Sequence, residues 1–351
     1  MDQRMTAAVL TGHGGPELLV VRDDVAVPHP SQGEVLVQVA AAAVNNTDIW
    51  TRQGAYGSAD DPDAVVGWQG VPLDFPRIQG GDVAGVIVAV GTGVDAALTG
   101  RRVLIDPTTY ADDGDEPTLT AVLGSEHDGG FAEYVVVAAD RAHDVTDAPL
   151  SDAQLACLPI AYGTATGMLE RAELCAGETV LVTGASGGVG VALVQLARAR
   201  GARVIALTSE ATAAAVTAAG ASHTVARDAP DVADRVRAAA GGSVDVVADV
   251  VGGWVFRELF PLLATGGRWV TCGAVAGAVV DLDLRTLYLH RRRLIGSTMH
   301  TPAQFRQLVD DARHGRLDPQ VARSYPLTRI HAAQADFATG REVGKLVLLP
   351  G

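Results

Sequence analysis

The pattern of apolar and polar positions divides the chain into two parts of different texture. Up to residue 148, short apolar runs are separated by Gly, Pro and Asp. These runs are Glu34–Val44, Asp82–Gly91, Arg101–Asp106 and Phe131–Ala138. Short apolar runs bounded by turn residues predict β-strands. Two acidic, turn-rich insertions, at 57–72 and 106–130, interrupt this part, and we expect them to be surface loops.

From Ser151 onward, Val-rich segments alternate with Ala-rich segments of helical periodicity. The first pair is "ETVLVTG" and "GGVGVALVQLARARG", and the alternation continues to the helical segment "WVFRELFPLLATGG" and the strand "RWVTCG". Strands that are apolar on both faces and alternate with helices indicate a doubly wound parallel sheet, a Rossmann-type α/β fold.

The last part of the chain adds three elements. A short basic run, "HRRRL", leads into the strand "LIGSTM", a helix is predicted over 301–315, and the strand "GKLVLLP" returns to the first domain. The expected organisation is a mostly β domain of residues 1–148, completed by 301–351, and an α/β dinucleotide-binding domain of residues 149–300.

Composition and charge narrow the function classes. A length of 351 residues with 48% apolar content fits two domains. The net charge of −14 excludes general binding to nucleic acids or anionic membranes, which needs clustered cations. No apolar leader and no membrane-length apolar run is evident, so we expect a cytoplasmic protein. Three widely spaced cysteines are expected to be reduced thiols.

A glycine-rich segment between a strand and a helix predicts a dinucleotide site. Its central residues are Ala185, Ser186, Gly187, Gly188, Val189 and Gly190. Glycines here permit a tight turn, and they let the backbone bring a pyrophosphate to the helix N-terminus. The alternative is a plain strand–helix turn. The first fingerprint position is Ala185 and not glycine, a departure that needs a structural explanation.

The end of the second Rossmann strand favours NADPH over NADH. An NAD enzyme usually has an acidic residue there to bind the ribose hydroxyl, whereas this chain has Thr208 and Ser209. Small hydroxyls leave room for a 2′-phosphate, and Arg227 could bind it. Glu210 is the objection, because it could accept the hydroxyl of NAD. An ordinary surface arginine is the alternative for Arg227.

Several motifs occur in a fixed order along nearly the whole chain. They are "GGPELLV", "GEVLVQVAAAAVNNTD", "IQGGDVAGVIVAVG", "GGFAEYVVV", "VLVTGASGGVG", "LATGGRWVTCG", "LIGST" and "GKLVLLP". With these motifs the sequence resembles the medium-chain dehydrogenase/reductase superfamily. The resemblance implies a GroES-like catalytic domain built from both chain ends, a central Rossmann domain, and a nicotinamide dinucleotide between them. It also implies a homodimer that pairs the Rossmann edges.

Zinc-dependent members of this superfamily hold a catalytic zinc ion with a Cys, a His and a Cys. Matched by motif, those positions are Asn45, Gly81 and Tyr162, none of which is a good zinc ligand. We therefore expect no zinc and no other metal. Asn45 resembles the asparagine of the zinc-free quinone oxidoreductase branch, where it lies near the nicotinamide. A loop-stabilising amide is the alternative.

The resemblance also suggests candidates for catalysis and for the substrate pocket. Tyr56 matches the proposed proton-donating tyrosine of enoyl thioester reductases, and an aromatic pocket wall is the equal alternative. Thr166 and Gly273 match positions along the cofactor, and Lys345, the only lysine, is expected to be structural. Pocket residues are further expected at Trp50, Trp68 and Tyr162.

The primary hypothesis is a zinc-independent, NADPH-dependent reductase that transfers hydride to an activated C=C bond or a quinone. Such acceptors need no Lewis acid, because charge spreads onto oxygen and hydrogen-bond donors suffice. Two alternatives stay open: an alcohol dehydrogenase acting on a carbonyl, and an NADPH-binding protein with a structural or regulatory role. In the enzyme hypotheses the partner is a small-molecule substrate.

Overall fold

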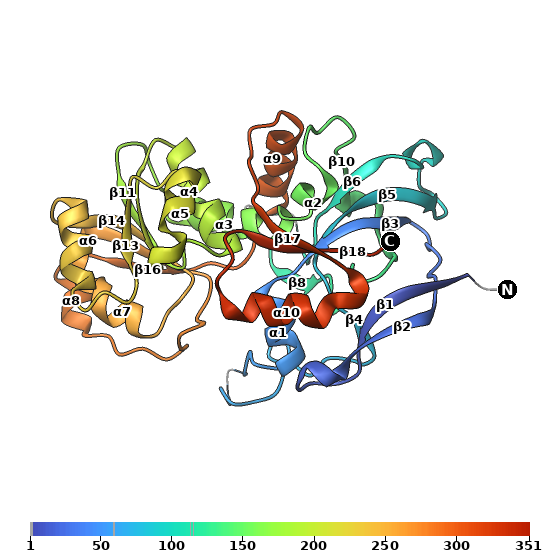
Figure 1. Cartoon of the computed structure of the whole chain (residues 1–351), viewed down its shortest axis with the longest axis horizontal. Coiled ribbons are helices and arrows are strands. Elements are labelled where there is room, and N and C mark those ends of the chain that lie inside the picture. Colours follow the sequence, from blue (N-terminus) through green and yellow to red (C-terminus); the bar gives the residue numbers. More distant parts are fainter. Residues whose placement is uncertain (1–2, 59, 113, 115) are drawn as a thin grey trace. The chain divides into compact units, whose positions relative to one another are not determined.

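The computed structural model describes residues 3–58, 60–112, 114 and 116–351 (Figure 1). The chain forms two compact units, the first made of residues up to 160, 301–340 and 345–351, the second of 161–300 and 341–344. The first unit extends to Ile160 and not only to residue 148. The reason is that the segment after residue 148 is anchored there: the Ile160 N–H donates to the Asp82 carboxylate at 2.7 Å.

The first unit is built on a seven-stranded sheet in the order β10-β6-β5-β3-β18-β17, with β9 also paired to β3. Its strands are β3 (Glu34–Ala43), β5 (Asp82–Val90), β6 (Arg102–Ile105), β9 (Tyr134–Ala138), β10 (Ala142–Asp144), β17 (Val321–Pro326) and β18 (Lys345–Leu349). The predicted strands of the first part are confirmed, and so is the return of the last strand, because β18 pairs antiparallel with β3. In Figure 1 the chain's last strands therefore lie beside an early one.

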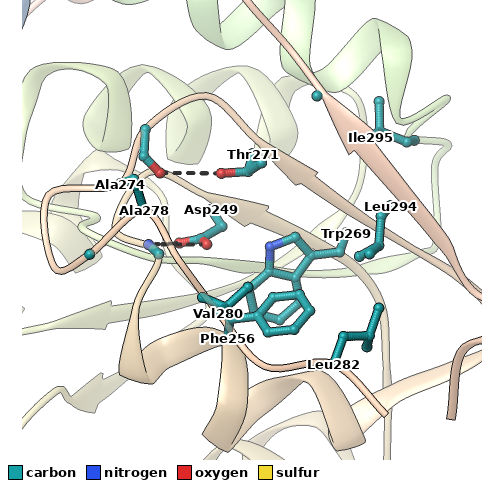
Figure 2. A pocket seen from close by; sticks show the side chains of 14 residues that line it. Asp249, Phe256, Trp269, Thr271, Ala274, Ala278, Val280, Leu282, Leu294 and Ile295 are labelled. Carbon is teal, nitrogen blue, oxygen red and sulfur yellow. Dashed lines mark hydrogen bonds between the residues drawn. The ribbon is translucent and has the colours of Figure 1, made fainter. Parts of the chain in front are cut away.

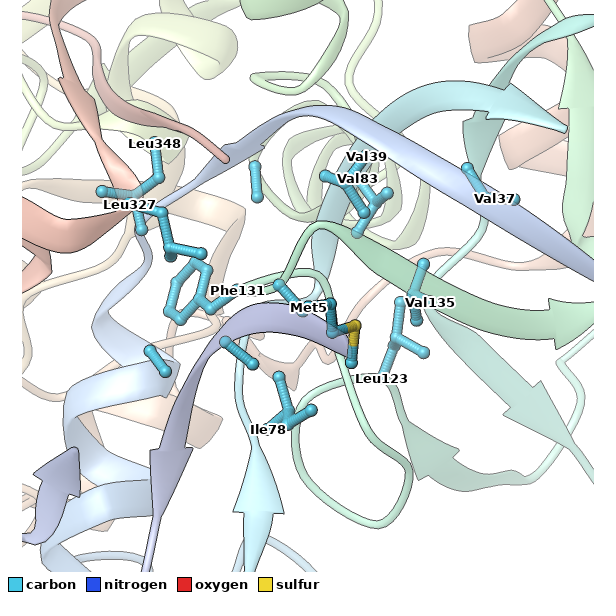
Figure 3. Packing of buried hydrophobic residues seen from close by; sticks show 14 of the residues in the cluster. Met5, Val37, Val39, Ile78, Val83, Leu123, Phe131, Val135, Leu327 and Leu348 are labelled. Atoms are coloured by element: carbon cyan, nitrogen blue, oxygen red, sulfur yellow. The ribbon is translucent and has the colours of Figure 1, made fainter. Parts of the chain in front are cut away.

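A smaller sheet and four helices complete the first unit. The sheet has the order β2-β1-β4, with β1 (Arg4–Leu10), β2 (Leu19–Ala26) and β4 (Arg77–Ile78). The helices are α1 (Asn46–Gln53), α2 (Asp152–Leu155), α9 (Pro302–Arg313) and α10 (Ile330–Thr339). Apolar side chains from both sheets and from the C-terminal segment form one core around the fully buried Phe131 (Figure 3). Burial of one such aromatic side chain contributes about 1.5–3 kcal/mol.

The insertion at 106–130 is only partly a loop. It contains a hairpin of β7 (Thr108–Tyr110) and β8 (Leu119–Val122), paired antiparallel. The expectation of a surface loop was wrong for these strands, because strands of three and four residues are too short to show a strand pattern in the sequence. The insertion at 57–72 has no regular element among its described residues and joins the unit through a bridge between Ala55 and Val66.

The second unit is a six-stranded parallel sheet in the order β13-β12-β11-β14-β15-β16, which confirms the Rossmann-type prediction. Its strands are β11 (Thr179–Val182), β12 (Arg203–Thr208), β13 (His223–Ala226), β14 (Val244–Asp249), β15 (Leu263–Thr271) and β16 (Arg293–Gly296). Its helices are α3 (Pro159–Arg171), α4 (Gly188–Ala199), α5 (Ala213–Ala219), α6 (Val232–Ala240), α7 (Trp254–Leu259) and α8 (Leu284–Tyr288).

The helix expected over 254–267 is shorter in the structure. α7 ends at Leu259, a 3₁₀ turn with Pro261 follows, and β15 begins at Leu263. Proline cannot donate the hydrogen bond that a continued helix needs, so the apolar run after it becomes strand. Among the described residues, no helix is long and apolar enough to cross a membrane.

Candidate active site

The turn between β11 and α4 has the shape that a pyrophosphate needs. Gly184 adopts a φ of +55°, a conformation that side chains disfavour, whereas Ala185 is buried and donates its N–H to the Leu207 carbonyl at 3.2 Å. The turn glycine is therefore Gly184, which explains the departure at Ala185. A Cβ on Gly190 would lie 2.1 Å from the Gly184 oxygen, so only glycine permits this close packing of helix and turn.

The N-terminus of α4 is open to an anion. Gly187 is the N-cap residue and has no side chain to bond the first helical N–H groups, which lack partners within a helix. A Cβ on Gly187 would meet no atom closer than 3.5 Å, so space lies over this residue. The N–H groups of the first turn, with the positive end of the helix dipole, fit a dinucleotide pyrophosphate at Ser186, Gly187, Gly188 and Val189.

The predicted ribose-binding residues lie together at the ends of β12 and β13. The Arg227 N–H donates to the Thr208 carbonyl at 2.8 Å, and the Arg227 side chain is exposed. The Thr208 hydroxyl is buried and bonds the Thr212 hydroxyl at 2.7 Å, so it is turned into the unit. Ser209 is half-buried and Glu210 exposed, which leaves both, with Arg227, accessible.

A pocket of about 410 Å³ lies by the carboxyl ends of β14, β15 and β16 (Figure 2). Gly273 and Asp249 are among its lining residues. Phe256, Trp269 and Leu294 are among its apolar walls (Figure 2). The Asp249 carboxylate accepts the Thr183 hydroxyl at 2.6 Å and fixes the strand ends. Ligands of open parallel sheets bind near such ends. Thr166, half-buried on α3, does not line this pocket.

In the first unit, Asn45, Asp82 and Lys345 form a buried polar group. The strand register brings them together, because Ala43 at the end of β3 pairs with both Asp82 and Val347. Lys345 forms a 2.8 Å ion pair with Asp82 and donates to the Asn45 side-chain oxygen. The Asn45 amide nitrogen donates to Asp82 at 2.8 Å and to the Ala43 carbonyl at 3.2 Å. Sequence reasoning missed this pairing.

Asp48 adds a second buried carboxylate beside this group. It accepts the Asn45 N–H at 2.7 Å, a capping contact that begins α1. Burial is the main cause that raises the pKa of Asp48 to about 7. The Asn45 hydrogen bond and the Lys345 charge oppose this rise, and the Asp82 charge adds to it. Asp48 is therefore the group of this site that titrates near neutral pH.

Tyr56 follows α1 and points back to it. Its hydroxyl lies 2.5 Å from the Thr47 hydroxyl, and its ring meets Trp50 edge-on at 5.5 Å between centroids. Burial raises the pKa of Tyr56 to about 12, so the phenol is neutral at physiological pH and can donate a proton or a hydrogen bond. This geometry suits a proton donor and a pocket wall alike, and its role stays a prediction.

The two insertions are joined to each other near Tyr56. The Trp68 indole N–H donates to Glu126 at 2.7 Å, and Gln69 donates to the Thr120 carbonyl. Glu126 also accepts the Val122 N–H at 2.9 Å. Trp68 is thus held in place by the Glu126 carboxylate of the second insertion. Both residues are too far apart in sequence for any local pattern to pair them.

The residues at the three positions of a catalytic zinc do not fit that ion. The Asn45 amide is bound to Asp82 and Lys345, whose ammonium would repel a cation. Gly81 has no side chain to offer, and a Cβ there would lie 2.7 Å from the Ile160 Cδ1 and 3.0 Å from the Leu123 carbonyl oxygen, so a larger residue would require its neighbours to shift. Tyr162 is buried and donates to Gln195 at 2.7 Å. Within the described ranges, no cluster of three His, Cys, Asp or Glu could hold a metal.

Comparison with known proteins identifies the family. Two family models match: an alcohol dehydrogenase GroES-like domain over residues 31–147 and a zinc-binding dehydrogenase over residues 188–313. The chain is 30% identical to the quinone oxidoreductase of Rattus norvegicus, covering 96% of this chain and 95% of that protein. It is 31% identical to the acryloyl-coenzyme A reductase of Metallosphaera sedula, and this match covers 98% of this chain and 99% of that protein.

Solved structures extend the comparison to the fold. A structure from Sinorhizobium meliloti 1021, provisionally assigned as an alcohol dehydrogenase, matches with a TM-score of 0.95 at 49% identity, covering 100% of this chain and 98% of that one. A thermostable alcohol dehydrogenase of Pyrobaculum aerophilum, solved with cobalt and zinc, matches with a TM-score of 0.85 at 31% identity, covering 99% and 100%.

The fold and the dinucleotide turn, with these relatives, define a member of a family of oxidoreductases that depend on a nicotinamide dinucleotide. The chain belongs to the medium-chain dehydrogenase/reductase superfamily, in which quinone oxidoreductases are among its relatives.

Proposed function

We propose that this protein is a zinc-independent, NADPH-dependent reductase of an activated C=C bond or a quinone. The observation that carries the proposal is the buried group of Asn45, Asp82 and Lys345, which replaces metal-ligand chemistry with an internal ion pair. A carbonyl acceptor concentrates the developing charge on one alkoxide oxygen, where a Lewis acid gives the most stabilisation. An enone or a quinone delocalises that charge, so hydrogen-bond donors are enough.

The dinucleotide, when bound, supplies the hydride. The turn at Ser186–Gly190 would hold its pyrophosphate against the N-terminus of α4. Tyr56 would hold a proton at its phenol oxygen, and it stays neutral across the physiological pH range because burial raises its pKa to about 12. Thr47 orients this hydroxyl through their 2.5 Å contact. Donation to an enolate carbon would complete C=C reduction.

The charge of the two insertions favours a neutral substrate. Residues 57–72 and 106–130 together contain ten Asp or Glu and no Lys or Arg. They are tied to each other through Trp68 and Glu126 beside the Tyr56 segment. A coenzyme A thioester carries several phosphate charges and would be repelled by such walls. A small enone or quinone is therefore the preferred substrate class, and an acyl thioester is the less favoured one.

The choice of NADPH over NADH depends on Arg227. Its exposed side chain begins next to Thr208, at the strand end where a 2′-phosphate would lie. Within the described part of the chain the Arg227 side chain is exposed and has no ion pair, so its guanidinium is available for a phosphate. Glu210 is the residue that would reverse this preference.

The test is turnover by metal-stripped enzyme. We expect oxidation of NADPH with enones or quinones in the presence of a chelator, slower turnover of enoyl-coenzyme A, and no turnover of aldehydes. We also expect Arg227→Ala to weaken NADPH binding by about 10-fold or more in a fluorescence titration, without weakening NADH binding. Asp228→Ala, one residue further along the same exposed turn, is the matched control and should bind both dinucleotides as before.

Two other outcomes would replace the proposal. Aldehyde or alcohol turnover that appears only with added zinc would establish an alcohol dehydrogenase, the alternative supported by the 49% identical structure. Tight NADPH binding with no turnover on the whole panel would favour a structural or regulatory role.

We further infer that two copies pair through the β16 edge. β16 is the last strand of its sheet and is bonded to β15 on one side only. Several apolar side chains near it are exposed: Val279, Val280, Leu284, Tyr288, Leu289 and Leu294. An unpaired edge with an apolar surround aggregates unless it is covered, and a two-fold axis lets a second copy cover it.

A further inference from the structure

We propose that Lys345 is a positioning residue for the reaction, which holds the side-chain amide of Asn45 in one of its two orientations. The inference rests on the proposed function, in which Asn45 lies near the nicotinamide. It assigns a role in turnover to a residue that the sequence indicates only as part of a terminal strand.

An amide side chain has two nearly isosteric orientations, which exchange its oxygen and its nitrogen. At Asn45 the two neighbours have opposite polarity. Lys345 can only donate and faces the oxygen, whereas the ionised Asp82 can only accept and faces the nitrogen at 2.8 Å. The flipped orientation would set the NH₂ group against the ammonium and the oxygen against the carboxylate. Lys345 and Asp82 together therefore select one orientation.

The polar partners of the Asn45 amide come from three strands and from α1. Both hydrogens of the amide have acceptors, at Asp82 and at the Ala43 carbonyl, and its oxygen accepts from Lys345. The capping box of α1 also directs the Asp48 N–H at the Asn45 side chain. The orientation with the oxygen toward Lys345 and the nitrogen toward Asp82 is the one that satisfies these partners.

An ion pair with a purely structural role at this place would carry a large desolvation cost. Lys345 is 4% exposed and Asp82 is fully buried, so both charges lose their hydration. A pair of apolar residues of similar volume often stabilises a fold as well or better. The ion pair does what an apolar pair could not do, because it presents a donor to one end of the amide and an acceptor to the other.

The chain also links Lys345 directly to the dinucleotide turn. Gly344 belongs to the second unit, where its N–H donates to the Ser186 carbonyl at 3.0 Å. The next residue along the chain is Lys345. One hydrogen bond and one peptide bond therefore connect the Ser186 carbonyl to the backbone of Lys345.

The first test is a double-mutant cycle on turnover. Lys345→Met alone leaves Asp82 charged and unpaired, so the variant used is Lys345→Met with Asp82→Asn. We expect kcat to fall by about 10- to 100-fold with little change in NADPH affinity. Adding Asn45→Ala in this background should change kcat little further, although Asn45→Ala alone lowers it by a similar factor. Losses that multiply would overturn the proposal.

A control separates positioning from general destabilisation. Arg102 is a partly buried cation of the same unit that binds Asp152 at 2.6 Å and does not contact Asn45. Arg102→Met should lower the thermal midpoint and leave kcat unchanged at temperatures where the variant is folded. An equal fall of kcat in the Arg102→Met variant would show that the effect is not specific to Lys345.

The second test does not depend on turnover. Because Lys345 is the only lysine, labelling lysine with ¹³C at its ε-carbon alone gives one side-chain signal in NMR spectra. We expect this signal to shift when Asn45→Ala is introduced and again when NADPH is added to the wild-type protein. A chemical shift that stays unchanged when NADPH is added would overturn the positioning role. A shift without turnover of any acceptor would keep the role and reject the proposed reaction.

Discussion

At the scale of single residues, Tyr56 separates the two candidate acceptors. Protonation of carbon completes C=C reduction, whereas a reduced quinone takes its protons on oxygen, where water can supply them. We expect Tyr56→Phe to lower kcat for an enone by about 10²-fold or more and to change quinone reduction little. Steady-state rates with both acceptors check this.

The matched control for this substitution is Tyr325→Phe, which also removes a phenol that is hydrogen-bonded in the first unit, there to Asp336 at 2.5 Å. Both rates should stay unchanged in this variant. An enone rate that survives Tyr56→Phe would leave Tyr56 the role of a pocket wall.

Asp48 gives the stability of the protein a pH dependence of unusual sign for a carboxylate. Its pKa is raised by burial to about 7 from 3.8, so the folded state binds the proton more tightly than the unfolded state. Its contribution to stability is fully present below pH 4 and is lost as pH rises toward 7. Between pH 5 and pH 8 the wild-type protein should lose this contribution and Asp48→Asn should not. We expect the free energy of unfolding of Asp48→Asn to rise by about 2 kcal/mol relative to that of wild type over this pH interval. Urea unfolding at both pH values measures this, and parallel behaviour of the two proteins would contradict it.

The glycine turn was nominated from its strand–glycine–helix pattern, and Asn45 and Tyr56 from motifs that resemble those of the superfamily; the roles of these residues stay predictions. These patterns were not sufficient to find the partners of these residues. Lys345 meets Asn45 only through the pairing of β18 with β3, and Glu126 meets Trp68 only through the packing of the two insertions. Such pairs depend on strand register and tertiary packing, which no window along the chain contains.

At the scale of elements, the join of β11 to α4 depends on Gly190. A Cβ there would lie 2.1 Å from the Gly184 oxygen and 2.7 Å from the Ala185 Cα, both backbone atoms that cannot turn aside. We expect Gly190→Ala to lower the free energy of unfolding by about 1–3 kcal/mol and to weaken NADPH binding. Urea unfolding and fluorescence titration measure the two effects.

Gly187→Ala is the comparison, because its Cβ would meet nothing closer than 3.5 Å at a φ of −72°. Its free energy of unfolding should stay within about 1 kcal/mol of wild type. Equal destabilisation by both substitutions would argue against close packing at Gly190.

Elements with strong periodicity were predicted well, as the parallel sheet and the long strands β3 and β5 show. The β7–β8 hairpin was missed because its strands have three and four residues, too few to establish an alternation. The helix after residue 253 was extended too far, because the apolar run continued beyond Pro261 and only the proline marked its end.

At the scale of the whole molecule, the exposed edge at β16 predicts that the protein is a dimer in solution. We expect sedimentation velocity to give twice the chain mass of 36.2 kDa. Leu294→Asp places a charge in β16 on an apolar side chain that is 43% exposed, and it should yield monomers. Val20→Asp, at a similar exposure of 40% in the first unit, should leave the dimer intact. A wild-type protein that sediments as a monomer would contradict the pairing.

The burial of Lys345 also determines how the protein meets amine-directed reagents. Its other side-chain cations at neutral pH are arginines, and the one lysine amine is 4% exposed. A succinimidyl ester can acylate that amine only when the surrounding strands separate, so the rate of acylation measures how often the first unit opens. The acylation rate at Lys345 therefore reports opening of the fold under native conditions, and no other lysine contributes to it.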